Sequence, residues 1–276
     1  MINFNGDLIP KDEFSISYQN RGFKYGDAIF DTLKYEREIY FIEDHYFRLM
    51  SSMRMLRMKI PMHFTLEYYK DEITKTILKN KLKDSVRIRV SVYRNEGGLY
   101  TPLTNETSFI IETEELKTTS KENYEIELFK DFSVQSGLLS TIKTNNRIVN
   151  VLSGIYSDEN NYDNCILINE KKNIVETSNA NIFLIFGNKV ITPPLTDGCI
   201  NGIIRLKLLE FFKNDEDFEF VEQTISPFEL LKSDEIFLTN SIFEIQSVTN
   251  YRKKQFNIVK TEEIRSIFNS KKASSD

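Results

Sequence analysis

The sequence of 276 residues contains no tryptophan, only two cysteines and only two histidines. Cys165 and Cys199 allow at most one disulfide bond, which excludes a disulfide-stabilised scaffold. His45 and His63 are too few for a histidine-rich metal site, and we expect no metal. No apolar run approaches the ~20 residues of a membrane span. The first residues also lack the basic start and apolar stretch of a secretory signal.

Several motifs that mark common enzyme classes are also missing. The chain has no glycine-rich dinucleotide loop, no GK[ST] phosphate loop, no GxSxG and no CxxC. These absences argue against hydride transfer and nucleotide hydrolysis. The formal net charge of −5 argues against nucleic-acid binding. We therefore expect a cytoplasmic enzyme or small-molecule binder with no nucleic-acid or membrane partner.

The first part of the chain mixes helical and strand patterns. Residues 44–58 have helical spacing behind a predicted Asp44 N-cap, and Thr65 is predicted to cap a second helix. Residues 86–93 alternate apolar and polar side chains, as a half-buried strand does. We expect Thr107–Glu112 to pair with this strand.

A polar stretch at residues 114–122 has no apolar period, and we interpret it as a linker. We thus expect one domain over residues 1–116 and a second over residues 117–276. The second domain is rich in predicted strands. Its helices are predicted over residues 145–157 and 201–212 and, from a capping box, at Ser226–Glu229. Because strands and helices do not alternate strictly, the pattern favours an α+β fold.

Several polar residues are candidates for chemistry, and each also has an ordinary structural interpretation. Lys143, in the segment IKTNN, has an amine that can form a Schiff base, although most lysines are only surface charges. Glu176 ends a predicted strand, where a solvated carboxylate is common. Arg48 is locally better explained by a surface ion pair, and His45 by a cap or packing role.

Two segments could bind a phosphate group. Gly198–Arg205 opens an amphipathic helix with two glycines, so backbone N–H groups can approach an anion where the helix dipole favours negative charge. The alternative is a plain turn and N-cap. Leu238–Ser241 follows an apolar strand and offers either turn residues or further phosphate ligands.

In combination, these segments resemble the class IV aminotransferases, the D-amino acid aminotransferase-like family of fold type IV pyridoxal 5'-phosphate (PLP) enzymes. The family includes branched-chain aminotransferases and aminodeoxychorismate lyases. The resemblance begins at Asn5-Gly6, covers nearly the whole chain and continues through six ordered motifs. These motifs are Arg21–Lys34, Phe41–Leu49, IKTNN around Lys143, Val175–Phe183, Asn201–Arg205 and Asp234–Ser241.

The resemblance implies a role for each matching residue. Lys143 matches the Schiff-base lysine, which also shuttles the proton. Glu176 matches the carboxylate that keeps the pyridine nitrogen protonated, so that the ring acts as an electron sink. Arg48 matches the arginine on the cofactor phosphate. The other implied phosphate ligands are the backbone N–H groups of Ile203 and Ile204, together with Asn240 and Ser241; Ile204 replaces a common threonine and loses its hydroxyl.

The resemblance also implies an architecture and a reaction. We expect an N-terminal α/β domain and a C-terminal barrel-like α/β domain, with PLP in the cleft between them, and a homodimer whose partner loop closes the site. The leading expectation is transamination between an amino acid and a 2-oxo acid. The alternative is a 4-amino-4-deoxychorismate lyase, which expels pyruvate and leaves 4-aminobenzoate. A PLP-binding protein without turnover is disfavoured because both Lys143 and Glu176 are retained.

Details of the motifs bear on the reaction. Phe30 stands where D-amino acid aminotransferases usually have tyrosine, and Arg94–Pro102 lacks their Arg/His pair. The Tyr-x-Arg-Pro pattern of branched-chain enzymes is also missing. Asn201, the pair Gly97-Gly98 and the segment LTNS resemble the lyases. Transamination remains the leading expectation because it is the commoner activity of the class.

Overall fold

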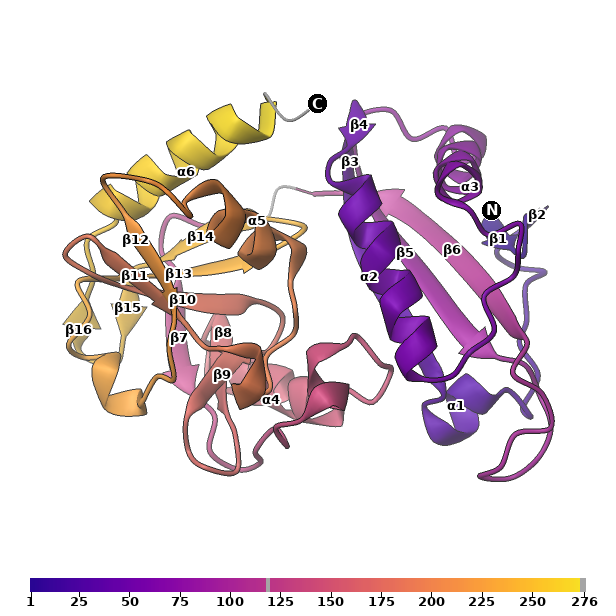
Figure 1. The fold of residues 1–276 in the computed structure, drawn as a ribbon, viewed down its shortest axis with the longest axis horizontal. Helices are drawn as coiled ribbons and strands as arrows, with labels where there is room; N and C mark the ends of the chain where they lie inside the picture. Colours follow the sequence, from indigo (N-terminus) through magenta and orange to yellow (C-terminus); the bar gives the residue numbers. More distant parts are fainter. Residues whose placement is uncertain (118–119, 274–276) are drawn as a thin grey trace. The chain divides into compact units, whose positions relative to one another are not determined.

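The computed structural model describes residues 1–117 and 120–273, and the chain forms two compact units (Figure 1). Unit 1 comprises Met1–Thr118 and Lys143–Asn146, and unit 2 comprises Thr119–Ile142 and Arg147–Asp276. Each unit contains both helices and sheets, so the predicted α+β class is confirmed. The segment Lys143–Asn146 groups with unit 1, although the sequence led us to expect it in the second domain.

Unit 1 is built on one antiparallel sheet of six strands, in the order β2-β1-β6-β5-β3-β4. Helices α2 and α3 pack against the sheet, and Figure 1 shows α2 lying along it. The elements are β1 (Ile2–Phe4), β2 (Asp7–Ile9), α1 (Arg21–Tyr25), β3 (Ala28–Glu36), β4 (Glu38–Ile39), α2 (Ile42–Met55), α3 (Leu66–Lys79), β5 (Ser85–Arg94) and β6 (Thr107–Glu115).

The alternation predicted for residues 86–93 is confirmed in β5, whose valine and isoleucine side chains are buried and alternate with half-exposed polar ones. The nine-residue strand β3 was missed. Its apolar alternation through Ile29 and Leu33 is interrupted by Asp31, which is buried with only 1% of its surface exposed. Asp31 is tolerated there because Arg48 pairs with it, and no local pattern reveals that partner.

Of the two N-caps predicted in unit 1, one is confirmed and one is wrong. Thr65 caps α3 as predicted, because its hydroxyl accepts a hydrogen bond from the Tyr68 N–H at 3.2 Å. The Asp44 N-cap is wrong, since α2 begins at Ile42 behind Phe41, a left-handed residue without a side-chain cap bond. Asp44 instead lies in the first helical turn, where a negative charge is favourable.

Unit 2 contains two five-stranded sheets, in the orders β12-β11-β10-β13-β14 and β16-β15-β7-β8-β9. One apolar core contains residues of both sheets, among them Ile126, Ile166, Ile182 and Ile236. The strands are β7 (Glu125–Leu128), β8 (Asn164–Ile168), β9 (Ile174–Thr177), β10 (Asn181–Phe186), β11 (Lys189–Thr192), β12 (Glu219–Glu222), β13 (Glu235–Asn240), β14 (Glu244–Val248), β15 (Asn250–Tyr251) and β16 (Lys254–Gln255). The helices are α4 (Ile148–Glu159), α5 (Ile203–Phe211) and α6 (Val259–Ala273), with short 3-10 turns η1 (Leu138–Thr141), η2 (Leu195–Asp197) and η3 (Pro227–Glu229).

Two helix predictions in unit 2 need correction. The helix expected from residue 145 begins at Ile148, because the preceding residues pair with β3 instead. The capping box at Ser226 is present, but it opens only the single turn η3. The expected linker includes residues 118 and 119, which lie outside the described residues. Among the residues that the structure describes, no helix is long and apolar enough to cross a membrane.

Candidate active site

Lys143 is held in extended backbone beside β3. The Phe30 N–H donates to the Lys143 carbonyl at 2.8 Å, and the Asn145 N–H donates to the Ala28 carbonyl at 2.9 Å. An antiparallel bridge joins Ile29 and Thr144 between these bonds. The lysine backbone is therefore fixed as an addition to the sheet of unit 1, neither on a free loop nor in a helix.

The Phe30 ring lies beside two cations. The Lys143 Nζ lies 5.1 Å from the ring centroid, and the Arg89 Cζ lies 3.8 Å from it. Burial lowers the pKa of the Arg89 guanidinium, against the attraction of Glu112 on the neighbouring strand. A partly desolvated cation beside the ring that the Lys143 amine also approaches makes the surroundings of Phe30 favourable for an anion such as a carboxylate.

Sequence reasoning missed Arg89 as a candidate. It was noticed only as a polar member of the alternating strand β5. The pairing of β5 with β3 would have indicated Arg89. It places Arg89 opposite Thr32, on the same face of the sheet as Phe30.

Arg48 is engaged with Asp31, the residue that follows Phe30. Its guanidinium contacts both carboxylate oxygens, with Nε 3.3 Å from Oδ2, and His45 Nδ1 lies 3.1 Å from Oδ1. Burial opposes ionisation of Asp31, but Arg48 and His45 together outweigh it and hold the pKa of Asp31 well below its usual range. The Arg48 side chain is only 11% exposed, so the surface ion pair considered for it is wrong.

Glu176 lies at the end of β9 and is buried, with 4% of its surface exposed. Its Oε2 accepts a hydrogen bond from the Ile200 N–H at 2.8 Å. The carbonyl of Ile200 in turn accepts from Asn181 Nδ2 at 2.9 Å. Glu176 is therefore no solvated strand-end carboxylate, and Ile200, which donates to it, is itself held through its carbonyl.

A half-buried cation accompanies Glu176. The Arg147 guanidinium donates to the Ile142 carbonyl, and burial lowers the pKa of Arg147 while the attraction of Glu176 raises it. No local pattern indicated this contact, because Arg147 falls where a helix was expected to have begun.

The segment that contacts Glu176 leads directly into α5. The helix begins at Ile203 behind Gly202, and no side chain of the described residues caps it. The first N–H groups of a helix have no intrahelical acceptor and favour an anion. The side chains of Ile203 and Ile204 are buried, so the backbone is what these residues offer. Gly202 is required here, because a Cβ on it would lie 2.1 Å from Asn181 Oδ1.

The LTNS segment ends β13, next to Asn181. Asn240 Oδ1 accepts from the N–H groups of Ile242 and Phe243 at 2.8 and 3.0 Å, so this side chain holds its own turn. Ser241 is half-buried in the same turn. The hydroxyl of Thr239, paired with Asn181 in the sheet, is buried without a hydrogen-bond partner among the described residues. Thr239 was not selected from the sequence.

The structure thus gathers the candidate residues into two groups. In unit 1, two successive residues of β3 hold Lys143 and Arg48. In unit 2, Glu176, the N-terminus of α5 and the end of β13 are joined through Ile200 and Asn181. Within the described parts of the chain, no cluster of three or more His, Cys, Asp or Glu side chains is arranged to hold a metal.

These residues fit PLP by their chemistry. An uncapped helix start and an unpartnered buried hydroxyl suit a phosphate. A fixed carboxylate suits a protonated ring nitrogen, and an amine next to an aromatic ring suits an aldehyde. The thiol of Cys199 contributes no nucleophile, because burial raises its pKa to about 12.

The fold and these residues define a two-unit α+β protein of the fold type IV class. The family model "Amino-transferase class IV" matches residues 28–251, and the chain belongs to this family. The relationship expected from the motifs is therefore confirmed.

Curated relatives of this chain have three different activities. The chain is 29% identical to a probable branched-chain-amino-acid aminotransferase of Aquifex aeolicus, over 89% of this chain and 82% of the relative. It is 24% identical to a D-alanine aminotransferase of Bacillus licheniformis, over 90% and 87%. It is 26% identical to an aminodeoxychorismate lyase of Vibrio harveyi, over 83% and 85%. Both reactions left open by the sequence occur among these relatives.

Solved structures agree with the fold. A branched-chain aminotransferase from Thermoproteus uzoniensis matches with a TM-score of 0.87 at 20% identity, covering 97% of this chain and 93% of that one. A putative 4-amino-4-deoxychorismate lyase from Legionella pneumophila matches with a TM-score of 0.84 at 21% identity, covering 94% and 96%. At these identities the likeness establishes the fold alone.

Proposed function

We propose that this protein is a PLP-dependent aminotransferase that moves an amino group between an amino acid and a 2-oxo acid. The observation that carries the proposal is that one short segment provides two structural features suited to PLP. Residues 200–204 supply both the N–H group that holds Glu176 and the uncapped start of α5. A carboxylate and an anion site on one rigid segment suit the two ends of the PLP ring system.

Each residue then has a defined task. Lys143 carries the cofactor and moves the substrate proton, and Glu176 holds the pyridine nitrogen protonated. The phosphate is bound by Arg48, by the N–H groups of Ile203 and Ile204, and by Asn240 and Ser241. Because the Asn240 side chain holds its turn, its backbone and the Thr239 hydroxyl are the better donors. When bound, PLP supplies the electron sink that makes proton removal feasible.

Arg89 is the proposed group for the substrate carboxylate. It lies against the same ring as the Lys143 amine, and we propose that a carboxylate bound there presents its amino-bearing carbon to Lys143. Guanidinium groups bind carboxylates through two parallel hydrogen bonds, which also orients the substrate. We further propose that the protein acts as a cytoplasmic homodimer, as the family resemblance implies.

Aminodeoxychorismate lyase activity is the second candidate. It is supported by the similarity to a lyase and by the Gly97-Gly98 pair, which the structure explains: both residues adopt left-handed φ angles of 114° and 77°, which disfavour other residues. A non-catalytic PLP-binding protein is the third outcome to be tested.

One assay separates these functions. The PLP-loaded protein is incubated with a panel of L- and D-amino acids plus a 2-oxo acid acceptor, and separately with aminodeoxychorismate. A new amino acid formed from the acceptor supports transamination. Pyruvate together with 4-aminobenzoate supports the lyase reaction. Neither product, from protein that holds PLP, would reject both enzymatic proposals.

A further inference from the structure

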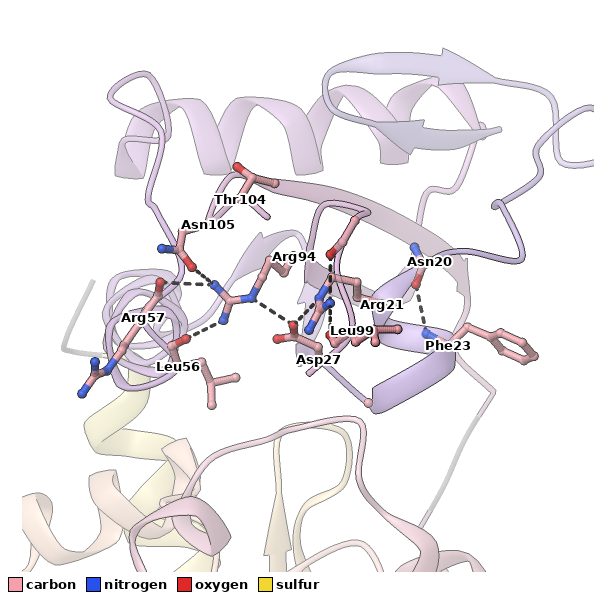
Figure 2. Close-up of polar contacts among 12 residues, drawn as sticks. Asn20, Arg21, Phe23, Asp27, Leu56, Arg57, Arg94, Leu99, Thr104 and Asn105 are labelled. Atoms are coloured by element: carbon pink, nitrogen blue, oxygen red, sulfur yellow. Dashed lines mark hydrogen bonds and ion pairs between the residues drawn. The ribbon is translucent and has the colours of Figure 1, made fainter. Parts of the chain in front are cut away.

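A buried ionic cluster lies directly before β3, where no function has been assigned. The carboxylate of Asp27 accepts from Nε of Arg21 and from Nε of Arg94, each at 2.9 Å (Figure 2). The side chains of the two arginines are only 4% and 7% exposed. Two guanidinium groups thus share one carboxylate in a largely dry environment, where removal of the carboxylate would be costly.

The cluster is tied to the surrounding chain by backbone carbonyls. Arg94 donates to the carbonyls of Leu56 at 2.6 Å and Arg57 at 3.3 Å, just after α2 (Figure 2). Arg21 donates to the carbonyls of Gly97 at 3.0 Å and Leu99 at 2.7 Å. Asp27 is therefore anchored to α1, to the end of α2 and to the loop after β5. It does not depend on solvent-exposed contacts.

This anchor continues directly into the strand that holds Lys143. Ala28 and Phe30 follow Asp27 in the chain, and they make the two backbone hydrogen bonds to the lysine segment, at Asn145 and Lys143. A shift of Asp27 along or across the sheet would therefore move the Lys143 backbone with it.

Gly26 adds a steric contact with the same segment. Its φ is +66°, and a Cβ on it would lie 2.1 Å from Asn146 Oδ1 and 2.7 Å from Asn146 Cγ. Asn146 Nδ2 also points at the Gly26 carbonyl, at 3.5 Å. The Asn146 side chain thus lies against Gly26, and a methyl group on Gly26 would displace it.

We propose that Gly26 and Asp27 are positioning residues for Lys143, with the Arg21–Asp27–Arg94 cluster as the anchor that sets where the lysine amine lies. The inference rests on the proposed function, in which that amine binds PLP. It assigns a task to the RGFKYGD segment, none of whose side chains belongs to the proposed cofactor or substrate ligands.

The test compares substitutions at two glycines with similar positive φ angles. Gly187 has a φ of +57° and nothing within 4 Å of its would-be Cβ, so Gly187→Ala introduces strain without a clash. Gly26→Ala introduces strain and displaces Asn146. The double variant Gly26→Ala/Asn146→Ala keeps the strain and removes the clashing atoms. For each protein we would measure the melting temperature, the PLP dissociation constant, and the yield of PLP fixed to Lys143 by borohydride, located by peptide mass.

We expect both single glycine variants to lose similar thermal stability. Only Gly26→Ala should bind PLP more weakly, by roughly 10-fold to 100-fold, and yield less PLP fixed to Lys143, since a misplacement of about 1 Å can cost about 10²-fold. The double variant should recover most of this loss. If Gly26→Ala matches Gly187→Ala in PLP fixation, or if removal of the Asn146 side chain restores nothing, the positioning role is wrong.

Asp27→Asn tests the anchor itself. The substitution keeps the size of the side chain but leaves two buried guanidiniums without their shared charge. We expect the visible absorbance of the PLP-bound protein to titrate at a different pH from the parent, because the Lys143 amine has moved. An unchanged titration in folded Asp27→Asn protein would remove Asp27 from the proposal. If the parent protein itself never fixes PLP at Lys143, the proposed function fails instead, so the two failures are distinguishable.

Discussion

Glu176 accepts a hydrogen bond from the Ile200 N–H at 2.8 Å, and Ile200 lies three residues before the first residue of α5. The carboxylate proposed for the ring nitrogen and the helix start proposed for the phosphate are therefore parts of one connected structure. A substitution that displaces one of them should therefore also displace the other.

Glu176→Gln tests the role of the carboxylate. The amide oxygen can still accept from Ile200, so the loop and PLP binding should be retained. A neutral amide no longer keeps the pyridine nitrogen protonated, and we expect proton removal from the substrate to slow by ~10²-fold or more. Stopped-flow measurement of the first half-reaction gives this rate. A rate equal to that of the parent protein would dismiss Glu176 from this role.

Asn181→Ala tests the connection between the two parts. Without its Nδ2 the Ile200 carbonyl loses its partner, and the 200–204 segment is less well fixed. One such hydrogen bond is worth about 0.5–1.5 kcal/mol net, so the PLP dissociation constant should rise by roughly 2-fold to 12-fold. Asn188→Ala, in the turn between β10 and β11, is the control that should leave PLP affinity unchanged. Equal affinities in parent and Asn181→Ala would show that the segment holds its place without this bond.

Lys143→Ala should abolish turnover, because no other group can supply the amine that PLP exchanges with the substrate. PLP should still bind through its phosphate ligands, but borohydride should no longer fix it to the protein. Lys171→Ala, an exposed lysine near the end of β8, is the matched control. Retention of full activity in Lys143→Ala would contradict the proposed mechanism.

The motifs predicted part of this site, and they did so where local sequence carries the chemistry. Lys143 and Glu176 stand in segments whose residue order is diagnostic, and Gly202 marks a helix start that the structure contains. Arg89, Asn181 and Thr239 were missed for a common reason. Each acquires its position only when distant strands pair: β5 with β3, and β10 with β13. No local pattern reports such a pairing.

The helices and strands were likewise predicted only where the local sequence determines them. Strands with clean alternation, such as β5, and side-chain caps, such as Thr65, are local features and were confirmed. The strand β3 was missed because Asp31 occupies a core position. The extended Lys143 segment was assigned partly to a helix, because its pairing partner lies more than 100 residues earlier in the chain.

Arg89→Gln tests recognition of the substrate. The amide keeps polar contacts near Phe30 but removes the positive charge. A charge-assisted hydrogen bond is worth about 1.5–3 kcal/mol, so kcat/KM for an amino acid should fall by roughly one to two orders of magnitude. PLP affinity should not change, since Arg89 is not a proposed phosphate ligand. A selective loss of PLP affinity with normal KM would show that Arg89 serves the cofactor and not the substrate.

Arg48→Met tests both the proposed phosphate contact and the ion pair with Asp31. We expect PLP affinity to fall by roughly one to two orders of magnitude, as for any lost charge-assisted contact. The fold should also lose stability, by about 3–5 kcal/mol at neutral pH, because the buried Asp31 keeps His45 but loses its guanidinium partner. The double variant Arg48→Met/Asp31→Asn removes the stranded charge and should recover much of the stability but not the PLP affinity.

The pH dependence of the same variant follows from the pKa of Asp31. In the parent protein this pKa is held well below its usual range, so its stabilising effect is complete above the unfolded-state pKa of about 3.9 and is lost only as pH falls below it. Without Arg48, burial is opposed by His45 alone, so the pKa of Asp31 rises and the carboxyl group of the folded variant takes up a proton at a higher pH than in the parent. The stability difference between parent and Arg48→Met should therefore shrink between pH 7 and pH 4. Urea unfolding across this range measures it, and a constant difference would mean that Asp31 does not depend on Arg48 for its charge.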